Sequence, residues 1–184
     1  LRNTIVSGNT GTNGGGLNNR EGQMTLVDSE VSNNRAEYGA GIRNASGSLT
    51  LTHSTVSRNE ATYAGGGLYN FNGEANLADS TVSGNSAGIY GGGVYNPEGT
   101  VSLVASTVSG NKAKTGGGLA NLSTLTVTRS TVSDNSAEAG GGLTLEDLLP
   151  GGVVKHQLLG HGLLLRPLSV LSIRSPGSVS GPPG

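Results

Sequence analysis

A six-residue phrase recurs along this chain at nearly constant intervals, and it constrains the fold more than any other feature of the sequence. The phrase has the form S-T-V-S-x-N and reads STVSGN at Ser80–Asn85 and again at Ser106–Asn111. Its last residue recurs at intervals of 25, 25, 26, 26 and 24 residues, as Asn9, Asn34, Asn59, Asn85, Asn111 and Asn135. A fixed period of this length is typical of a solenoid, in which each repeat is one unit stacked on its neighbour.

Two further motifs recur in phase with the phrase. A motif of the form G-G-G-L-x-N follows it and supplies a second series of asparagines, Asn19, Asn44, Asn70, Asn96 and Asn121. An alternating apolar pair precedes the phrase, as at Leu49/Leu51 and Val101/Leu103. This alternation indicates short strands, and three of them per repeat predict one turn of a coil with turns ~4.8 Å apart. We therefore expect an all-β fold, a right-handed parallel β-helix (solenoid) of about six turns.

In such a coil, equivalent residues of successive turns lie above one another. The valines of the phrase are expected to form one inward column of β-branched side chains. The asparagines are expected to form structural ladders, in which each side-chain amide donates to the side-chain carbonyl of the next turn. We also expect these asparagines to adopt the left-handed backbone that Asn tolerates at corners. The glycine triplets are expected to supply positive φ and close backbone approach.

Composition excludes several classes of partner. A net charge of −1 gives no reason to expect nucleic acid or an anionic membrane surface as a partner. The chain has no Cys, which excludes disulfides, and no apolar stretch long enough to predict a transmembrane helix. It begins in mid-phrase without a signal peptide, so we expect a fragment with its targeting segment upstream. Unpaired strand edges at both ends of the coil predict end-to-end self-association.

The pairing of the glycine motif with the V-S-x-N ending of the phrase resembles the repeat of the polymorphic outer-membrane proteins. In that family a GGA[ILV] motif alternates with an FxxN motif, and here Val takes the Phe position, as in Val82–Asn85. The sequence pattern of the repeat is also similar to that of right-handed parallel β-helix repeat proteins of bacterial surfaces. The resemblance covers residues 1–143 and rests on scaffold motifs. It implies a secreted or outer-membrane protein, such as the adhesive passenger of an autotransporter.

The repeat stops after Leu143, where Leu145 replaces the expected Asn and no further phrase follows. We therefore divide the chain into β-helix repeats at 1–143 and a non-repeat tail at 144–184. The tail has two interpretations: a reading-frame slip in the coding DNA, which the abrupt change favours, and a natural cap over the open end of the solenoid. We expect little fixed structure from about Ser175 on, where Gly, Ser and Pro predominate.

One polar column, directly before the phrase, is the candidate for catalysis. It contains Asp28, His53 and Asp79 in successive turns, followed by Ala105 and Arg129. An Asp–His–Asp stack can hold a metal or tune a proton acceptor. The other interpretation, which we favour, is a solvent-facing corner whose alternating charges avoid repulsion, because the column is only one residue wide. We expect no metal and no cofactor, since the remaining histidines and the glycine triplets match no metal or phosphate motif.

The tyrosines offer a better candidate for ligand binding. Tyr69 and Tyr95 occupy the x of the glycine motif, which alternation sends outward on adjacent turns, and Arg43 lies one turn below them. Tyr90 and Tyr38 precede the glycines at the nearby corner. Exposed tyrosine pairs stack on sugar rings and anchor interfaces, so Tyr69, Tyr95, Arg43 and Tyr90 form the predicted site. The other interpretation is a tyrosine ladder that packs on itself and stiffens the sheet.

These observations favour a structural or adhesive function outside the cell or on the bacterial outer-membrane surface. The chain is expected to present a binding face to a glycan or a host-surface protein, and not to be an enzyme. The alternative is a carbohydrate-active enzyme of the pectate-lyase-like fold, a polysaccharide lyase or hydrolase, that uses the Asp28–His53–Asp79 column. Local charge separates the two, because a lyase groove gathers several carboxylates and a base, and the sequence offers only this column.

Overall fold

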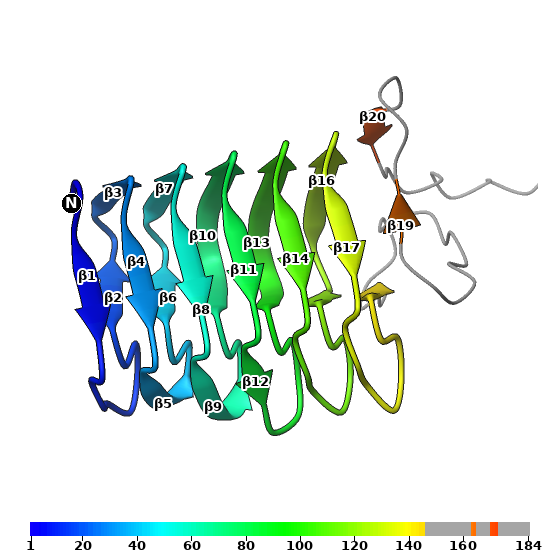
Figure 1. The fold of residues 1–184 in the computed structure, drawn as a ribbon, viewed down its shortest axis with the longest axis horizontal. Coiled ribbons are helices and arrows are strands. Elements are labelled where there is room, and N and C mark those ends of the chain that lie inside the picture. Colours follow the sequence, from blue (N-terminus) through cyan, green and yellow to red (C-terminus); the bar gives the residue numbers. More distant parts are fainter. Residues whose placement is uncertain (146–162, 165–169, 173–184) are drawn as a thin grey trace, which may run out of the picture.

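The chain folds into a parallel β-solenoid of about six turns (Figure 1). This computed structural model describes residues 1–145, 163–164 and 170–172, and these residues form strands and turns without a helix. The turns follow one another along the long axis in sequence order, from β1 at one end to β17 near the other. The all-β parallel solenoid expected from the repeat is therefore confirmed.

The recurring phrase forms the first sheet, one three-residue strand per turn. Its parallel strands are β1 (Ile5–Ser7), β4 (Glu30–Ser32), β8 (Thr55–Ser57), β11 (Thr81–Ser83), β14 (Thr107–Ser109) and β17 (Thr131–Ser133). Valine pairs with valine at every step of the stack, as Val56 with Val82 and Val82 with Val108. From Val31 onward these valines are buried, so the predicted inward column is confirmed.

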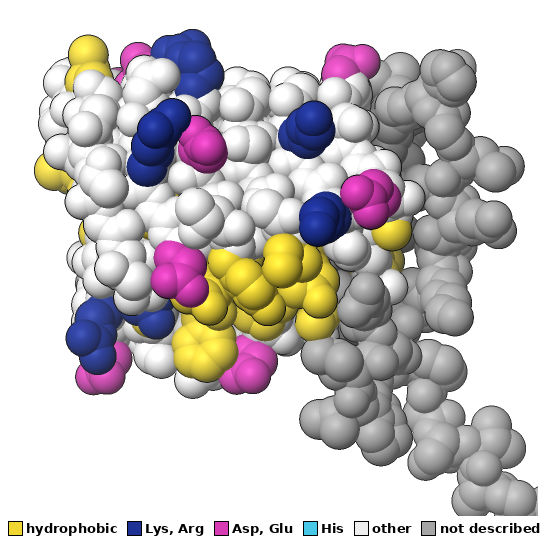
Figure 2. Space-filling model, turned by 90° about the horizontal axis from the view of Figure 1, so that it is seen from below, with side chains coloured by type: hydrophobic (Ala, Val, Ile, Leu, Met, Phe, Trp, Pro, Cys, Tyr) yellow, Lys and Arg dark blue, Asp and Glu magenta, His cyan; other side chains and the backbone are white. Residues whose placement is uncertain are grey.

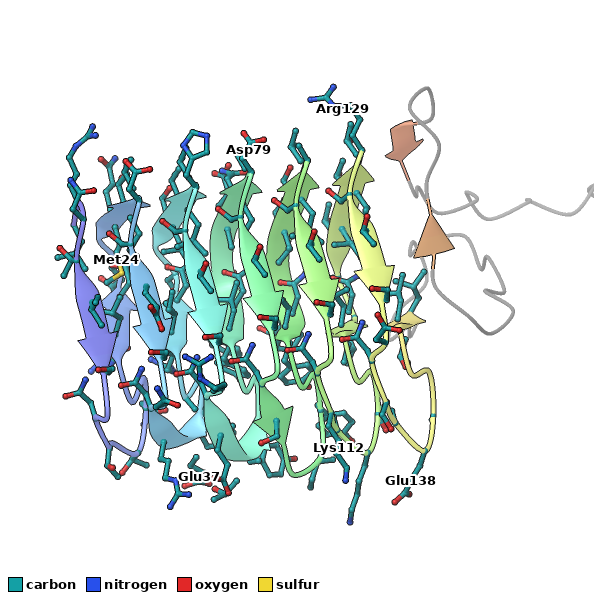
Figure 3. All side chains as sticks on the ribbon, viewed as in Figure 1. Met24, Glu37, Asp79, Lys112, Arg129 and Glu138 are labelled. Atoms are coloured by element: carbon teal, nitrogen blue, oxygen red, sulfur yellow. The ribbon has the colours of Figure 1, made fainter. Side chains whose placement is uncertain are left out.

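The glycine motif and the alternating apolar pair together form the second sheet. The glycine motif supplies β2 (Leu17–Arg20), β6 (Ile42–Ala45), β15 (Leu119–Asn121) and β18 (Leu143–Leu145), and the apolar pair supplies β3 (Gln23–Val27), β7 (Ser48–Thr52) and β16 (Thr124–Thr128). In the two middle turns the segments join into single eleven-residue strands, β10 (Leu68–Ala78) and β13 (Val94–Val104). Leucine, isoleucine and valine from both sheets meet in one buried core, against which Met24 also packs (Figure 3).

A third, short sheet was not predicted from the sequence. Its strands β5 (Arg35–Tyr38), β9 (Glu60–Ala64) and β12 (Ser86–Ala87) follow the ladder asparagines and close the lower edge of the coil (Figure 1). Behind it lies a separate small core that consists only of alanines: Ala36, Ala40, Ala61, Ala87 and Ala113. Because alanine adds little apolar area, this segment lacks the strong alternation by which the other strands were recognised.

The asparagines of the phrase form the first ladder, and its geometry confirms the predicted amide stacking. Nδ2 of each donates to Oδ1 of the Asn one turn further, at 2.9–3.0 Å. The same Oδ1 accepts the backbone N–H of the preceding ladder Asn, at 2.9–3.0 Å. Nδ2 donates a second bond to a valine carbonyl of the preceding turn. The side-chain amide of each inner Asn therefore makes four hydrogen bonds, twice the number that ladder stacking alone predicts.

The asparagines of the glycine motif form a second ladder on the opposite side of the core. Here Nδ2 donates to Oδ1 of the next turn at 2.6–2.9 Å, from Asn19 to Asn121. It also donates to the carbonyl of a glycine three residues later in its own turn, which closes the bend between the two strand segments. This ladder ends at Asn121, because its partner position holds Leu145, which packs against the core instead.

A third ladder consists of serines and was not predicted. The first Ser of each phrase accepts, through Oγ, the backbone N–H of the equivalent residue in the preceding turn, at 3.0–3.2 Å. Its hydroxyl donates to the carbonyl two residues earlier. These serines lie between two strands at a buried corner, where the hydroxyl replaces a missing backbone partner.

The ladder asparagines do not adopt the left-handed backbone, so that expectation is wrong. Positive φ falls on the residue before each Asn of the phrase instead, for example 53° at Arg58 and 55° at Asp134. A ladder Asn must direct its amide into the coil. The preceding residue, whose side chain faces solvent, therefore adopts the left-handed conformation that turns the chain. In each glycine triplet only the first residue has positive φ, and the others allow close approach: a Cβ on Gly67 would lie 2.7 Å from the Gly93 carbonyl oxygen.

The parallel stack ends at the C-terminal side with strands that run the other way. β19 (Leu163–Leu164) pairs antiparallel with β17, and β20 (Val170–Ser172) pairs antiparallel with β16. The last parallel strand of the second sheet among the described residues is β18, which ends at Leu145. The segment after Ser175, where we expected little fixed structure, lies outside the described residues. In the part that is described, no helix has the length and apolarity needed to cross a membrane.

Replacement of one ladder amide tests this account of stability. In Asn85→Ala, the buried backbone N–H of Asn59 and the carbonyl of Val56 lose their partners, and each unsatisfied buried group costs about 1–3 kcal/mol. We expect the free energy of unfolding, measured by denaturant titration, to fall by about 3 kcal/mol or more. The matched control is Asn13→Ala at an exposed position, with an expected change within about 0.5 kcal/mol. Equal effects of the two substitutions would contradict the account.

Candidate functional site

All six aromatic residues of the chain come together on three adjacent turns. They form a surface that we call the aromatic face: Tyr38, Tyr63, Tyr69, Phe71, Tyr90 and Tyr95. The face lies at the corner where the short third sheet meets strands β6, β10 and β13. In the view from the side of the third sheet, hydrophobic side chains gather in one patch over the middle turns, with charged side chains around it (Figure 2).

The register of the second sheet positions one column of this face. Tyr69 pairs with Tyr95 on one side and with Arg43 on the other, as the spacing of the glycine motif predicted. The column continues to Asn18 in one direction and to Ala120 in the other. Aromatic side chains therefore occupy only the middle of a column that every turn of the solenoid contains.

Ring contacts join this column to the tyrosines of the neighbouring corner. Tyr69 and Tyr95 have ring centroids 5.4 Å apart, and Tyr95 and Tyr90 stack at 5.3 Å with an interplanar angle of 13°. Tyr38 lies 5.6 Å from Tyr69 and 5.2 Å from Tyr63. Tyr63 is the most exposed ring, at 37%. These distances and tilts are typical of favourable aromatic pairs, so the face is a continuous layer of rings.

A glycine makes room for this layer. Gly65 precedes Tyr69 by four residues, and a Cβ on it would lie 2.7 Å from the Tyr69 Cβ and 2.7 Å from the Leu68 carbonyl oxygen. Its φ of 66° also favours glycine. The first glycine of the triplet therefore serves two purposes, since it makes the corner and it allows the outward side chain to lie close to the backbone.

The electrostatics of the face keep its central ring neutral. Burial raises the pKa of Tyr69 above its ordinary value, and the positive charge of Arg43 acts in the opposite direction. Glu98, on the next turn, also raises the pKa of this phenol. A tyrosine phenol is neutral at physiological pH, and the upward shift acts in the same direction. Tyr69 can therefore stack on a ligand and donate or accept hydrogen bonds.

The Asp28–His53–Asp79 column lies at a different place, on the upper edge of the coil. Nδ1 of His53 is 3.9 Å from Oδ1 of Asp28, and their side chains are 61% and 54% exposed. Asp79 and Arg129 project outward from this edge (Figure 3). The whole column has left-handed backbone, with φ of 47–50°. It is thus a projecting corner, whereas most small-molecule sites are concave.

Within the residues that the structure describes, no three His, Cys, Asp or Glu side chains are placed to hold a metal ion.

An open groove of about 800 Å³, which the sequence did not predict, lies along the third sheet and includes Glu60, Lys112, Lys114 and Glu138. Lys112 and Glu138 project from this lower edge (Figure 3). The backbones of the two glutamates lie three turns apart, about 14 Å along the solenoid axis at the usual strand spacing, so the two residues are not neighbours in the groove.

No family model, curated protein or solved structure matches this chain.

The predicted site residues Tyr69, Tyr95, Tyr90 and Arg43 do lie together. The structure adds Phe71 to them, together with Tyr38 and Tyr63, whose positions in the sequence also predict this side of the coil. The signal that could have found the whole face is the restriction of every aromatic residue to positions 38–95.

Proposed function

We propose that this solenoid is a rigid binding module of a bacterial secreted or cell-surface protein, and that its aromatic face binds a glycan. The observation that carries the proposal is the gathering of every aromatic side chain on one corner of three adjacent turns. An aromatic ring presents an apolar surface to the C–H face of a sugar, and the phenol oxygen provides a polar contact at its edge.

The arrangement of the face also supports a long ligand. Parallel stacking repeats the same position at each turn, so Tyr69 and Tyr95 form a row along the solenoid axis. A chain molecule laid along this axis meets equivalent groups at regular intervals. The interior hydrogen bonds fix the backbone beneath the rings, which lowers the entropy lost on binding.

Removal of the central rings tests the proposal. The double variant Tyr69→Ala/Tyr95→Ala is expected to lose at least about tenfold in affinity for glycans that the wild type binds on an array, because interface anchors of this type contribute most of the affinity. Tyr69→Phe/Tyr95→Phe keeps the stacking surface and is expected to retain most of the binding. Thr81→Ala/Thr107→Ala, on outward positions of the phrase sheet, is the control for unrelated surface changes.

Two results would contradict the proposal. Equal binding by the wild type and the Tyr69→Ala/Tyr95→Ala variant would exclude the aromatic face as the glycan site. Absence of any glycan binding by the wild type would exclude sugar as the ligand and point to a surface protein instead. Circular dichroism of each variant confirms that the solenoid has remained folded.

The second candidate function is a polysaccharide lyase or hydrolase, and the contact between Asp28 and His53 is the observation in its favour. The binding module is expected to release no unsaturated products from pectin or alginate, with or without calcium. Absorbance of the unsaturated products measures this directly. Activity that disappears in Asp79→Ala would favour the enzyme and overturn the binding module.

A further inference from the structure

Arg43 on the aromatic face has no carboxylate partner, whereas two other arginines of the solenoid do. Arg35 pairs with Glu60 at 2.9 Å, and Arg58 pairs with Glu30 at 3.4 Å. Across residues 1–145, no carboxylate lies within ion-pair distance of Arg43. Its positive charge is therefore not neutralised by a neighbouring side chain.

The hydrogen bonding of the Arg43 guanidinium is also incomplete. Nη1 donates to Oδ1 of Asn18 at 3.4 Å, a long and weak bond. Nε is buried and has no hydrogen-bond partner among the described residues. The guanidinium therefore keeps donor capacity that Asn18 does not use, and an anionic ligand can accept charge-assisted hydrogen bonds from it. The side chain as a whole is only partly buried, so a ligand has access to it.

Charge is distributed unequally along the aromatic face. Arg43 is the register partner of Tyr69 on one turn, and Glu98 is the register partner of Phe71 on the opposite turn. The charges of both act on the phenol of Tyr69, in opposite directions. Arg43 and Glu98 therefore place opposite charges on opposite turns beside Tyr69, while a second carboxylate, Glu37, interacts with Tyr38 on the Arg43 turn. A ligand with one negative group has a preferred orientation, in which that group lies at Arg43 and away from both carboxylates.

We propose that the aromatic face selects an anionic sugar, with its carboxylate or sulfate group at Arg43 and its ring on Tyr69. This inference rests on the proposed glycan-binding function and adds the chemical class of the ligand. Arg43 attracts the anion and donates charge-assisted hydrogen bonds to it, whereas Glu98 repels an anion at the other end of the face. A neutral sugar gains only the stacking contact.

Binding of defined oligosaccharides to charge variants tests this inference. The probes are hyaluronan oligosaccharides for carboxylate, dextran sulfate oligosaccharides for sulfate and dextran oligosaccharides as the neutral reference, each titrated calorimetrically. Arg43→Gln is expected to lower the affinity for one or both anionic probes about tenfold and to leave the neutral probe unchanged. Glu98→Gln is expected to raise the affinity for the same anionic probes. Arg58→Gln, which removes an equal charge from another part of the solenoid, is the matched control.

The outcomes separate this inference from the proposed function. If Arg43→Gln and the wild type bind the anionic probes equally, while Tyr69→Ala/Tyr95→Ala loses binding, the anionic class is wrong and the aromatic site stands. An equal loss in Arg43→Gln and Arg58→Gln would mean that net charge alone attracts the anion, and it also overturns the inference. A loss confined to one probe identifies carboxylate or sulfate as the group recognised. Failure of the tyrosine variant to lose binding overturns the function itself.

Discussion

The side-chain amide of asparagine is the interaction on which this solenoid depends. A coil this narrow turns its backbone at corners that are buried, and backbone groups at those corners have no strand partner inside their own turn. Asn supplies a donor and an acceptor at one position, so a single side chain can satisfy the turn before it and the turn after it. In the first ladder each inner amide makes four such bonds, and the inner members from Asn34 to Asn111 are buried. A substitution affects two turns at once, which explains why the phrase varies so little.

Registry also determines where chemistry can occur on this fold. Each outward position recurs at every turn, and the equivalent residues form a column along the axis. A binding site therefore arises where the residue type changes within a column, because the backbone follows the same path at every turn. Arg43, Tyr69 and Tyr95 are successive members of one column, and Asn18 and Ala120 flank them on either side. Such a site is a strip along the axis. A strip fits an extended ligand better than it fits a small substrate, which most enzymes enclose in a concave pocket.

Much of this architecture could be predicted from the sequence, because a solenoid converts sequence period directly into neighbouring positions. The valine column, both asparagine ladders and the pairing of Tyr69 with Tyr95 all follow from spacing. Three features did not. The alanine-backed third sheet has no apolar alternation, the serine ladder uses a residue that is common in turns, and the left-handed bend falls on Arg58 and Asp134 because the adjacent asparagines must face inward. Contacts between columns, such as Tyr38 with Tyr69, depend on the corner geometry, which spacing alone does not specify.

The central claim is that equivalent asparagines of successive turns stack in single file, and nuclear magnetic resonance tests it most directly. In a nuclear Overhauser experiment on ¹⁵N-labelled protein, the side-chain NH₂ protons of Asn59 are expected to show cross-peaks to those of Asn85, and those of Asn85 to Asn111. The slow exchange of these protons with solvent is expected to accompany the cross-peaks, because the amides are buried and bonded. Rapidly exchanging side-chain amides, with cross-peaks only to residues of their own turn, would contradict the stacked ladder and the solenoid built on it.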